Sequence, residues 1–450
     1  MNEQIFELLQ EHRFAELKEE LSKLYPVDIV EILETVPKRE LPVVFRILPK
    51  SLAADVFVEM DSDLQMLLIN CFSDNELKEV FDELFLDDAA DIIEEAPASV
   101  ARRILRQADP QTRKIINQIL AYPEDSAGSI MTTEYINLKK NMTVAEAFAR
   151  IRKIGLNSKD IYVNYVTDDN RKLIGVVTVK DLLLADETEI VSDLMDTNVI
   201  SVETTEDKED AALIFEKYDF LTLPVVDNEN RLVGIVTVDD AIDVLQEAAT
   251  DDINMMAAIT PSDKPYLKTS IFSIFKSRIL WLLILMFSAT ITGMIITSFE
   301  TALAAQVILT AFIPMLMNTG GNTGSQSSVT IIRGLSIGEI DFKDTFRVLR
   351  KEIGVSVICG IVLSVANFLK ILLVDIWMLN NGITIEIAFV VSASLLLTVI
   401  AAKTVGCLLP IIAKKIGFDP AVMASPFITT MVDILSLIIY FNLAKVILKI

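Results

Sequence analysis

Histidine and cysteine are nearly absent from this chain of 450 residues, which has one histidine and three cysteines. Cys71, Cys359 and Cys407 are far apart and form no CxxC pair, so the sequence predicts neither a disulfide framework nor a thiolate metal site. His12 alone cannot build a zinc or copper site, or a catalytic triad that contains histidine. The chain also has no phosphate-binding loop of the GxxxxGKS or GxxxxGKT type, and these absences together predict that it is not an enzyme.

Basic residues are scarce in the first part of the chain. Residues 1–275 hold 27 Lys and Arg against 54 Asp and Glu, whereas residues 276–450 hold 13 against 9. An acidic half is therefore joined to an apolar half. The acidic half excludes nucleic acid and anionic lipid surfaces as partners, and it would attract cations. Its first residues, MNEQIFELLQEHRF, are acidic and amphipathic rather than a signal peptide, which predicts that this half stays in the cytoplasm.

Apolar residues at helical spacing dominate the beginning of the chain. Short amphipathic units, such as FELLQEHRFAELKEELSKL and DIVEILETV, are separated by prolines and by Asp or Ser caps. This pattern predicts an all-α superhelical N domain over residues 1–122, built from stacked helix pairs. The domain is acidic and has no catalytic pattern, so we expect a regulatory role.

An internal repeat follows, with one copy at residues 129–188 and the other at 193–250. The two copies end in NYVTDDNRKLIGVVTVKDLLLA and LPVVDNENRLVGIVTVDDAIDV. The doubled pattern resembles a tandem pair of CBS domains, which implies an α/β fold and a regulatory module. Such modules often bind adenine nucleotides, so the resemblance implies ATP as a non-catalytic regulator, with Asp181, Phe220 and Pro224 as candidate contacts. A purely structural scaffold is the alternative.

Acidic residues continue along the last helix of the repeat, over residues 239–254. Such a helix is usually a solvated face, but its place between a regulatory module and the apolar half favours a role in sensing cations. Pro261 and Pro265 end the helix, and YLKTSIFSIFKSR is predicted to form a basic amphipathic helix that leads to the apolar half. We therefore expect a connecting element, a plug helix, over residues 251–278.

Five apolar segments in the second half are long enough to cross a bilayer. These segments are residues 279–299, 301–332, 353–374, 387–413 and 421–444. Basic residues gather before the first segment, between the second and third, and between the fourth and fifth, whereas the other two loops have none. This bias predicts a multi-pass protein of the plasma (inner) membrane, with its N-terminal half cytoplasmic and its C-terminus outside.

Asp433 is the only charged residue of the last apolar segment. A carboxylate at membrane depth costs several kcal/mol, about 2.5–3.5 on lenient scales, so it usually faces a water-filled path or a bound cation. Together with Pro426, Thr429, Ser436 and Tyr440 it forms a series with successive steps of three and four residues, which predicts one polar stripe along the helix. The alternative is a carboxylate that is hydrogen-bonded between helices for packing.

The second apolar segment has a small and polar centre, PMLMNTGGNTGSQSS, which begins at Pro314. Pro314 is expected to kink the helix, and the glycines allow close approach of a neighbouring helix. The small and polar residues that fall on one side are Asn318, Gly321, Asn322, Ser325 and Ser328. Two polar stripes and one carboxylate predict an oxygen-lined path for a hard cation. Because Mg²⁺ keeps its waters and needs few carboxylates, these residues indicate a hydrated divalent cation.

The whole chain resembles the MgtE family of bacterial magnesium channels and transporters. The motifs that carry the resemblance are AYPEDSAGSIMT (121–132), NTGGNTGSQSS (318–328) and DPAVMASPFITTMVDILSLIIYF (419–441). The resemblance implies a multidomain membrane protein with a helical N domain, a CBS pair, a plug helix and a five-helix transmembrane domain. It further implies Mg²⁺ as the ion, and a homodimer in the lipid bilayer with the pore on its two-fold axis.

The same resemblance assigns candidate metal-binding residues. Asp433 corresponds to the pore aspartate, and backbone oxygens near Thr429, Gly321 and Gly324 are expected to assist the hydrated ion. This chain departs from the family at Ser425, where a carboxamide is common, and at Thr429, where a smaller residue is common. The regulatory Mg²⁺ candidates are Asp240, Asp243, Asp251, Asp252, Asp88, Asp91 and Asp419.

Together these features predict a Mg²⁺-selective channel that takes up magnesium and that intracellular Mg²⁺ closes by binding between acidic cytoplasmic surfaces. Two alternatives remain open. One is an ion-coupled secondary transporter of divalent cations, in which Lys403 would be a coupling group. The other is a membrane-anchored CBS sensor that carries no ions.

Overall fold

The computed structural model describes residues 5, 7–9, 11–262, 266–379, 381–423 and 425–449, with the side chains of Asn157 and Ser425 excepted. Pro265, one of the two expected helix breakers, lies outside these residues. The chain forms two compact units, Met1–Leu245 and Gln246–Ile450, and each is described by itself.

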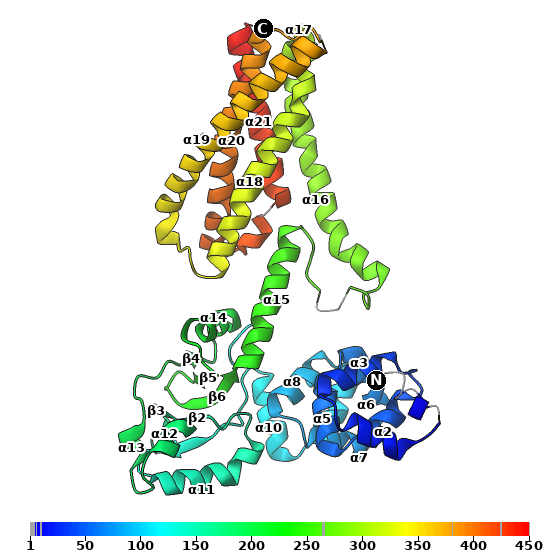
Figure 1. The fold of residues 1–450 in the computed structure, drawn as a ribbon, viewed down its shortest axis with the longest axis vertical. Helices are drawn as coiled ribbons and strands as arrows, with labels where there is room; N and C mark the ends of the chain where they lie inside the picture. The colour runs from blue at the N-terminus through cyan, green and yellow to red at the C-terminus, as the bar shows by residue number, and fades with distance from the viewer. Residues whose placement is uncertain are drawn as a thin grey trace. The chain divides into compact units, whose positions relative to one another are not determined.

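Short helices stack on one another in the N-terminal part of the first unit (Figure 1). They are α2 (Phe14–Leu21), α3 (Pro26–Thr35), α4 (Leu41–Ile47), α5 (Lys50–Val58), α6 (Ser62–Cys71), α7 (Asp74–Phe81), α8 (Leu86–Glu95), α9 (Ala98–Gln107) and α10 (Pro110–Ile119). Each buries one apolar face in a continuous core that includes Leu17, Leu33, Phe57 and Leu68. The helical N domain expected from the sequence is therefore confirmed.

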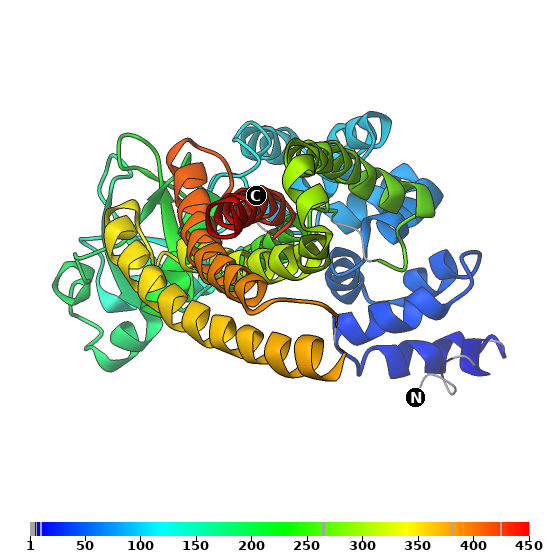
Figure 2. The same ribbon diagram turned by 90° about the horizontal axis from the view of Figure 1, so that it is seen from above.

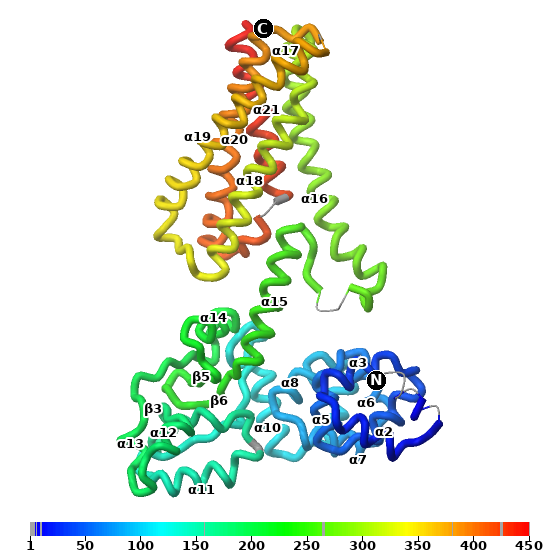
Figure 3. The backbone as a smooth tube through the Cα atoms, viewed as in Figure 1, coloured from blue at the N-terminus to red at the C-terminus, as the bar shows by residue number. Residues whose placement is uncertain are grey.

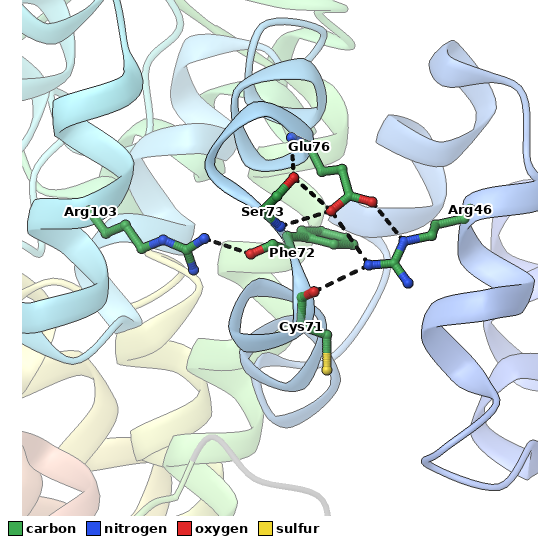
Figure 4. A network of polar contacts seen from close by, with 6 residues as sticks. All are labelled: Arg46, Cys71, Phe72, Ser73, Glu76 and Arg103. Carbon is green, nitrogen blue, oxygen red and sulfur yellow. Dashed lines mark hydrogen bonds and ion pairs between the residues drawn. The ribbon is translucent and has the colours of Figure 1, made fainter.

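Two arginines from neighbouring helices close the C-terminal end of α6 (Figure 4). Arg103 of α9 donates from Nη2 to the carbonyl of Phe72 at 2.6 Å, and Arg46 of α4 donates from Nη2 to the carbonyl of Cys71 at 3.2 Å. The last carbonyls of a helix have no partner within the helix, and a positive charge there is favourable. Arg46 also donates from Nε to Glu76 at 2.7 Å, and this bond lowers the pKa of Glu76 to about 2.

The repeat forms two similar α/β modules, which confirms the CBS pair. The first contains β1 (Asn137–Lys139), α11 (Val144–Ile154), β2 (Val163–Thr167), β3 (Leu173–Thr178) and α12 (Val179–Leu184). The second contains β4 (Val202–Glu203), α14 (Lys208–Tyr218), β5 (Thr222–Val226), β6 (Leu232–Thr237) and α15 (Val238–Met256), and α13 (Val191–Leu194) joins the modules. In each three-stranded sheet the first strand pairs in parallel with the second, and the second pairs antiparallel with the third.

The segment that opens each module packs on the sheet of the other module. A Cβ on Gly234 of β6 would lie 2.6 Å from the sulfur of Met131, and one on Gly175 of β3 would lie 2.6 Å from the sulfur of Met195. Thr132 pairs with β6 through a backbone bridge to Ile235. A Cβ on Gly234 would also lie 2.8 Å from the backbone oxygen of Thr132, so glycine is favoured where the two modules meet. This exchange ties the two modules together.

The acidic extension of the last CBS helix is confirmed, because α15 continues without a break from Val238 to Met256. The expected basic helix over 266–278 is not a separate element. Its residues from Ile271 onward form the beginning of the long helix α16, and Ser270 caps that helix by accepting a hydrogen bond from the backbone of Ser273.

Long helices form the second unit (Figures 1 and 2). They are α16 (Ile271–Ser298), α18 (Ile313–Ser336), α19 (Thr345–Lys370), α20 (Ile385–Lys415) and α21 (Ser425–Leu448), with the short α17 (Glu300–Ala305) after α16. A stretch of π-helix, Ile371–Met378, continues α19, and 3₁₀ turns occupy Val307–Phe312, Phe342–Asp344 and Pro420–Met423. Helices α18, α20 and α21 contact one another, α19 packs on α20, and α16 packs on α21 (Figure 3).

Four helical stretches of the described residues are long and apolar enough to cross a membrane, namely 271–298, 342–378, 385–415 and 420–448. The remaining long helix, α18, has 24 residues and carries the small and polar centre of the second expected span. That span begins later than expected, at Ile313. Pro314 lies in the first turn of α18 and does not kink it, which corrects our expectation. Proline is tolerated there because a first-turn N–H has no partner within the helix.

Candidate functional site

Asp433 lies on α21 and is half-buried. Among the residues that the structure describes, no side chain donates a hydrogen bond to it or pairs with its charge. Its neighbours on the predicted stripe differ. The hydroxyl of Ser436 donates to the carbonyl of Val432 at 2.6 Å, and that of Tyr440 donates to the carbonyl of Leu309 at 3.0 Å. Both of these side chains are fully buried and satisfied, so the stripe divides into a packing part and a part around Asp433.

Helices α18 and α21 meet at glycines of the small and polar centre. A Cβ on Gly321 would lie 3.0 Å from Cγ2 of Thr429, and a Cβ on Gly324 would lie 2.9 Å from Cγ2 of Ile428. The structure therefore brings Gly321 and Thr429 into contact, one turn before Asp433 on α21. Gly324 packs against Ile428 instead.

Other members of the second stripe lie on the surface of the protomer. Asn318 and Asn322 are both exposed, and the amide of Asn322 donates to Asn318 at 3.3 Å. Ser328, by contrast, is fully buried and belongs to the packing interior. The side chains of Asn318 and Asn322 are thus exposed on α18, close in sequence to Gly321, which contacts Thr429.

In the first unit, carboxylates from two elements surround the ammonium group of Lys159. Its Nζ lies 2.6 Å from Asp87, 3.6 Å from Asp88 and 3.5 Å from Asp240. We call these four residues the Lys159 cluster. Asp87 and Asp88 belong to α8 of the N domain, and Asp240 belongs to the first turn of α15 in the second CBS module. The cluster is largely buried, with only 12% of the Lys159 side chain exposed.

Burial and like charges alter the acids in and around this cluster. Burial and the charge of Asp87 raise the pKa of Asp88 to about 7. Burial also raises the pKa of Glu134, which accepts a hydrogen bond from the backbone of Leu86 at 2.9 Å, to about 7. Burial alone would lower the pKa of Lys159, but the surrounding carboxylates outweigh the effect of burial and raise this pKa. The cluster therefore holds more acid groups than its one ammonium can neutralise.

The candidates Asp88 and Asp240 are thus brought together, and Asp91 lies close enough on α8 to feel the charges of both. One oxygen of Asp87, Oδ1, is buried and has no hydrogen-bond partner among the described residues. Oxygen donors of this kind suit Mg²⁺. However, within the described ranges no group of three or more acidic, histidine or cysteine side chains is arranged to hold a metal ion. Lys159 occupies the centre of the carboxylates instead.

A second acidic pair lies in the second unit, at the end of α15. Asp252 accepts a hydrogen bond from the hydroxyl of Ser336, the last residue of α18, at 2.7 Å. Burial, together with the charge of Asp419, raises the pKa of Asp252. Beside it, Met255 and Met256 pack against the fully buried Ile332 and Ala421. The other two candidates on α15 are Asp243, which is exposed, and Asp251, which is half-buried.

The three candidate nucleotide contacts lie in different local settings in the described structure. Asp181 belongs to the N-terminal cap of α12, where it accepts hydrogen bonds from the hydroxyl and backbone of Thr178 at 2.5 and 3.1 Å. Pro224 is buried in β5, and Phe220 stacks on Tyr218 at 5.4 Å. A cavity of about 490 Å³ in the second module is lined by other residues, namely Ser201, Glu203, Thr205, Glu206, Val226, Asp227, Asn228 and Asn230.

Sequence reasoning missed several residues of these clusters. Lys159 and Glu134 lie in loops of the first CBS module without a motif of their own. Asp87 belongs to an acidic run, LDDAADIIEE, in which nothing distinguished it from its neighbours. Glu352 borders the third apolar segment. Its ion pair with the buried Lys403 depends on helix packing, which residue spacing alone does not reveal.

Three family models match successive parts of the chain. They are the MgtE intracellular N domain at residues 24–125, the CBS domain at 127–187 and 191–247, and the MgtE divalent cation transporter at 313–443. The chain is 36% identical to a magnesium transporter MgtE of Thermus thermophilus, over 98% of this chain and 97% of that protein. It is 34% identical to the magnesium transporter MgtE of Bacillus subtilis, over 97% and 95% of the two chains.

Solved structures resemble the cytoplasmic half. One is the cytosolic domain of the Mg²⁺ channel MgtE in complex with ATP, with 36% identity and a TM-score of 0.52 over 54% of this chain and all of that one. Another is the soluble part of a magnesium transporter, with 28% identity and a TM-score of 0.52 over 55% and 98% of the two chains. Because the sequence similarity covers nearly the whole length and all parts of the chain, the protein belongs to the MgtE family of magnesium transporters.

Proposed function

We propose that this protein is a homodimeric Mg²⁺-selective channel of the plasma membrane, with its C-terminus outside and with gating by intracellular Mg²⁺. The observation that carries the proposal is Asp433, a half-buried carboxylate with no partner among the described residues, one turn from the contact between Thr429 and Gly321. At membrane depth such a carboxylate is costly unless a cation or water accompanies it.

A single carboxylate per chain suits an ion that keeps part of its hydration shell. Mg²⁺ dehydrates reluctantly and binds through one or two carboxylates while other groups contact its waters. The amides of Asn318 and Asn322 are exposed on α18 and are suited to such water contacts. A second copy that covers this face would place two Asp433 carboxylates along one path and would remove polar amides from contact with lipid.

For gating, we propose that Mg²⁺ binds the acidic candidates and stabilises the closed form. Asp88, Asp91 and Asp240 supply excess negative charge in the first unit, and Asp252 with Asp419 does so where α15 ends. Ions that bind the closed form more tightly shift the equilibrium toward it. By analogy with the ATP complex of the MgtE cytosolic domain, ATP is a candidate regulator at the CBS pair, with Asp181, Phe220 and Pro224 as contacts to test.

The test is Mg²⁺ flux into proteoliposomes that contain the full chain or its variants. We expect Asp433→Ala to lower the flux by about a hundredfold or more, and Asp433→Asn to lower it less, because the amide keeps polar oxygen but loses the charge. Glu386→Gln, which removes an exposed carboxylate in the first turn of α20, is the matched control and should conduct like wild type. Wild-type flux in Asp433→Ala would exclude this residue from the path.

A further inference from the structure

Lys403 lies within α20 and is almost fully buried, with 7% of its side chain exposed. Its Nζ donates to the hydroxyl of Ser327 on α18 at 3.1 Å and lies 3.7 Å from Oε2 of Glu352 on α19. The hydroxyl of Ser327 donates to the same carboxylate oxygen at 2.6 Å. We call Lys403, Glu352 and Ser327 the buried triad. Each residue comes from a different helix, so the triad ties α18, α19 and α20 together.

The buried triad lies one helical turn from a crossing where two backbones touch. Gly324 precedes Ser327 by three residues on α18, and Gly406 follows Lys403 by three residues on α20. A Cβ on Gly406 would lie 2.2 Å from the backbone oxygen of Gly324, so no side chain fits there. Residues three apart lie on the same side of a helix. The triad and the glycine crossing therefore fix the same faces of α18 and α20 against each other.

The orientation of α18 also decides what it presents to α21. Gly321 lies one turn before Gly324, and it contacts Thr429, which precedes Asp433 by one turn. A rotation of α18 about its own axis would separate Gly321 from Thr429 and would turn Asn322 away from this face. The position of the polar groups of α18 relative to α21 thus depends on the contacts that hold α18.

We propose that Lys403 and Glu352 are positioning residues for cation conduction, which act by holding α18 against α20 so that Gly321 stays beside Thr429. The inference rests on the function proposed above. An unpaired charge at this depth is unfavourable, whereas a buried pair with an additional hydrogen bond is tolerated. The ammonium of Lys403 is therefore matched by Glu352.

The test compares Mg²⁺ flux per folded protein for Lys403→Met, Glu352→Gln and the double variant, in proteoliposomes, with folding checked by size exclusion and thermal melting. Each single variant leaves one buried charge unpaired, so we expect the flux to fall about tenfold, and the double variant to recover to within about threefold of wild type. The ratio of Mg²⁺ to Ca²⁺ flux should change in the single variants and return in the double variant. A loss of stability alone would not move this ratio.

Lys370→Met is the matched control, because Lys370 is paired with Asp375 at 2.8 Å but is half-exposed and distant in sequence from the glycine crossing. It should conduct like wild type. A double variant that conducts no better than the single variants overturns the inference and favours a coupling role for Lys403. Wild-type flux with a wild-type ion ratio in Lys403→Met also overturns it, because Lys403 would then have no role in conduction. If the single variants do not fold, the double variant alone decides, because the inference requires it to fold and conduct.

Asp433→Ala in the same experiment separates this inference from the proposed function. Blocked flux in Asp433→Ala with unaffected flux in the triad variants overturns only the positioning role. A wild type without Mg²⁺ flux overturns both.

Discussion

Charged side chains are arranged in opposite ways in the two units of the chain. In the first unit, the Lys159 cluster gathers three carboxylates around one ammonium group. In the second unit, the buried triad matches one carboxylate with one ammonium, and Asp433 has no partner in the part of the chain that the structure describes. The Lys159 cluster holds an excess of negative charge, whereas the buried triad is balanced.

The difference follows from what surrounds each region. In a domain outside the membrane, buried acids can take up protons and so lose their charge, and dissolved cations can neutralise acids that stay ionised. At membrane depth these sources are absent, so charges are paired or lie on a path for ions. The excess around Lys159 agrees with the sensing role proposed above, and Asp433 agrees with the proposed place on an ion path. The predictions below test each side of this contrast.

The largest effect is expected when carboxylates are removed from α15. With the gating proposed above, alanine at Asp240, Asp243, Asp251 and Asp252 together should raise the Mg²⁺ concentration for half-closure by about tenfold or more, because the closed form would lose its proposed Mg²⁺-binding groups. Electrical recording of the full-length protein at stepped Mg²⁺ concentrations measures this shift. The variant leaves Asp433 in place, so the maximal current should stay the same.

A matched control removes the same number of charges elsewhere. Alanine at the exposed Glu16, Glu19 and Asp82 and at the half-buried Glu20 deletes four carboxylates of the N domain far in sequence from α15. These residues make only surface ion pairs, which contribute little, so closure should follow wild type. Equal shifts in both variants would mean that net charge, rather than the residues of α15, sets the response.

A smaller effect is expected from Lys159→Met, which removes the ammonium from its cluster. Asp87, Asp88 and Asp240 would then repel one another without a neutralising partner, and α8 should lose about tenfold in hydrogen-exchange protection when Mg²⁺ is absent. Added Mg²⁺ should restore the protection, because the more negative cluster attracts a divalent ion more strongly. Hydrogen exchange of peptides from α8 in the full-length protein measures both steps.

Arg152→Met provides the comparison for that experiment, because Arg152 lies on α11 of the same module and contacts Phe148 rather than the cluster. It should leave the protection of α8 unchanged. If Lys159→Met leaves α8 as protected as in wild type without Mg²⁺, the ammonium does not hold the N domain to the CBS pair.

Much of the fold was predictable, because it depends on local patterns. Helical spacing identified the N domain, the doubled ending of the repeat identified the CBS pair, and the resemblance to the MgtE family is confirmed. Pro314 was misjudged because a proline breaks a helix only in its interior, and the sequence did not show that α18 begins at Ile313. The polar stripe on α21 was read from spacing, which cannot tell that Ser436 and Tyr440 turn inward while Asp433 does not.

The clusters were less predictable, because they join residues that are far apart in the sequence. Asp88 and Asp240 were candidates separately, but Lys159 between them depends on how a loop of the first CBS module meets α8. Glu352 and Lys403 are likewise separated by 51 residues and meet only when α19 packs on α20. No spacing rule connects such residues. Their roles as metal-binding or positioning groups therefore stay predictions.

The smallest effect concerns pH, and its sign follows from the acids near Lys159. The pKa values of Asp88 and Glu134 rise from ordinary values of 3.8 and 4.5 to about 7 in the folded protein. Folding therefore takes up protons, so the stability that these groups add is fully present below about pH 4 and is lost as pH rises through about 7. Without Mg²⁺, protection of α8, corrected for the intrinsic exchange rate, should fall a few-fold, roughly threefold, between about pH 6 and about pH 8. Mg²⁺ added at the higher pH should reverse the fall, since it binds the ionised carboxylates.

Asp88→Asn should flatten the pH dependence of this protection, whereas Asp28→Asn, in the first turn of α3, should leave it as in wild type. If the hydrogen-exchange protection of α8 instead rises with pH in the absence of Mg²⁺, the attraction of the carboxylates to Lys159 outweighs their mutual repulsion. The cluster would then have no excess negative charge for a cation to neutralise.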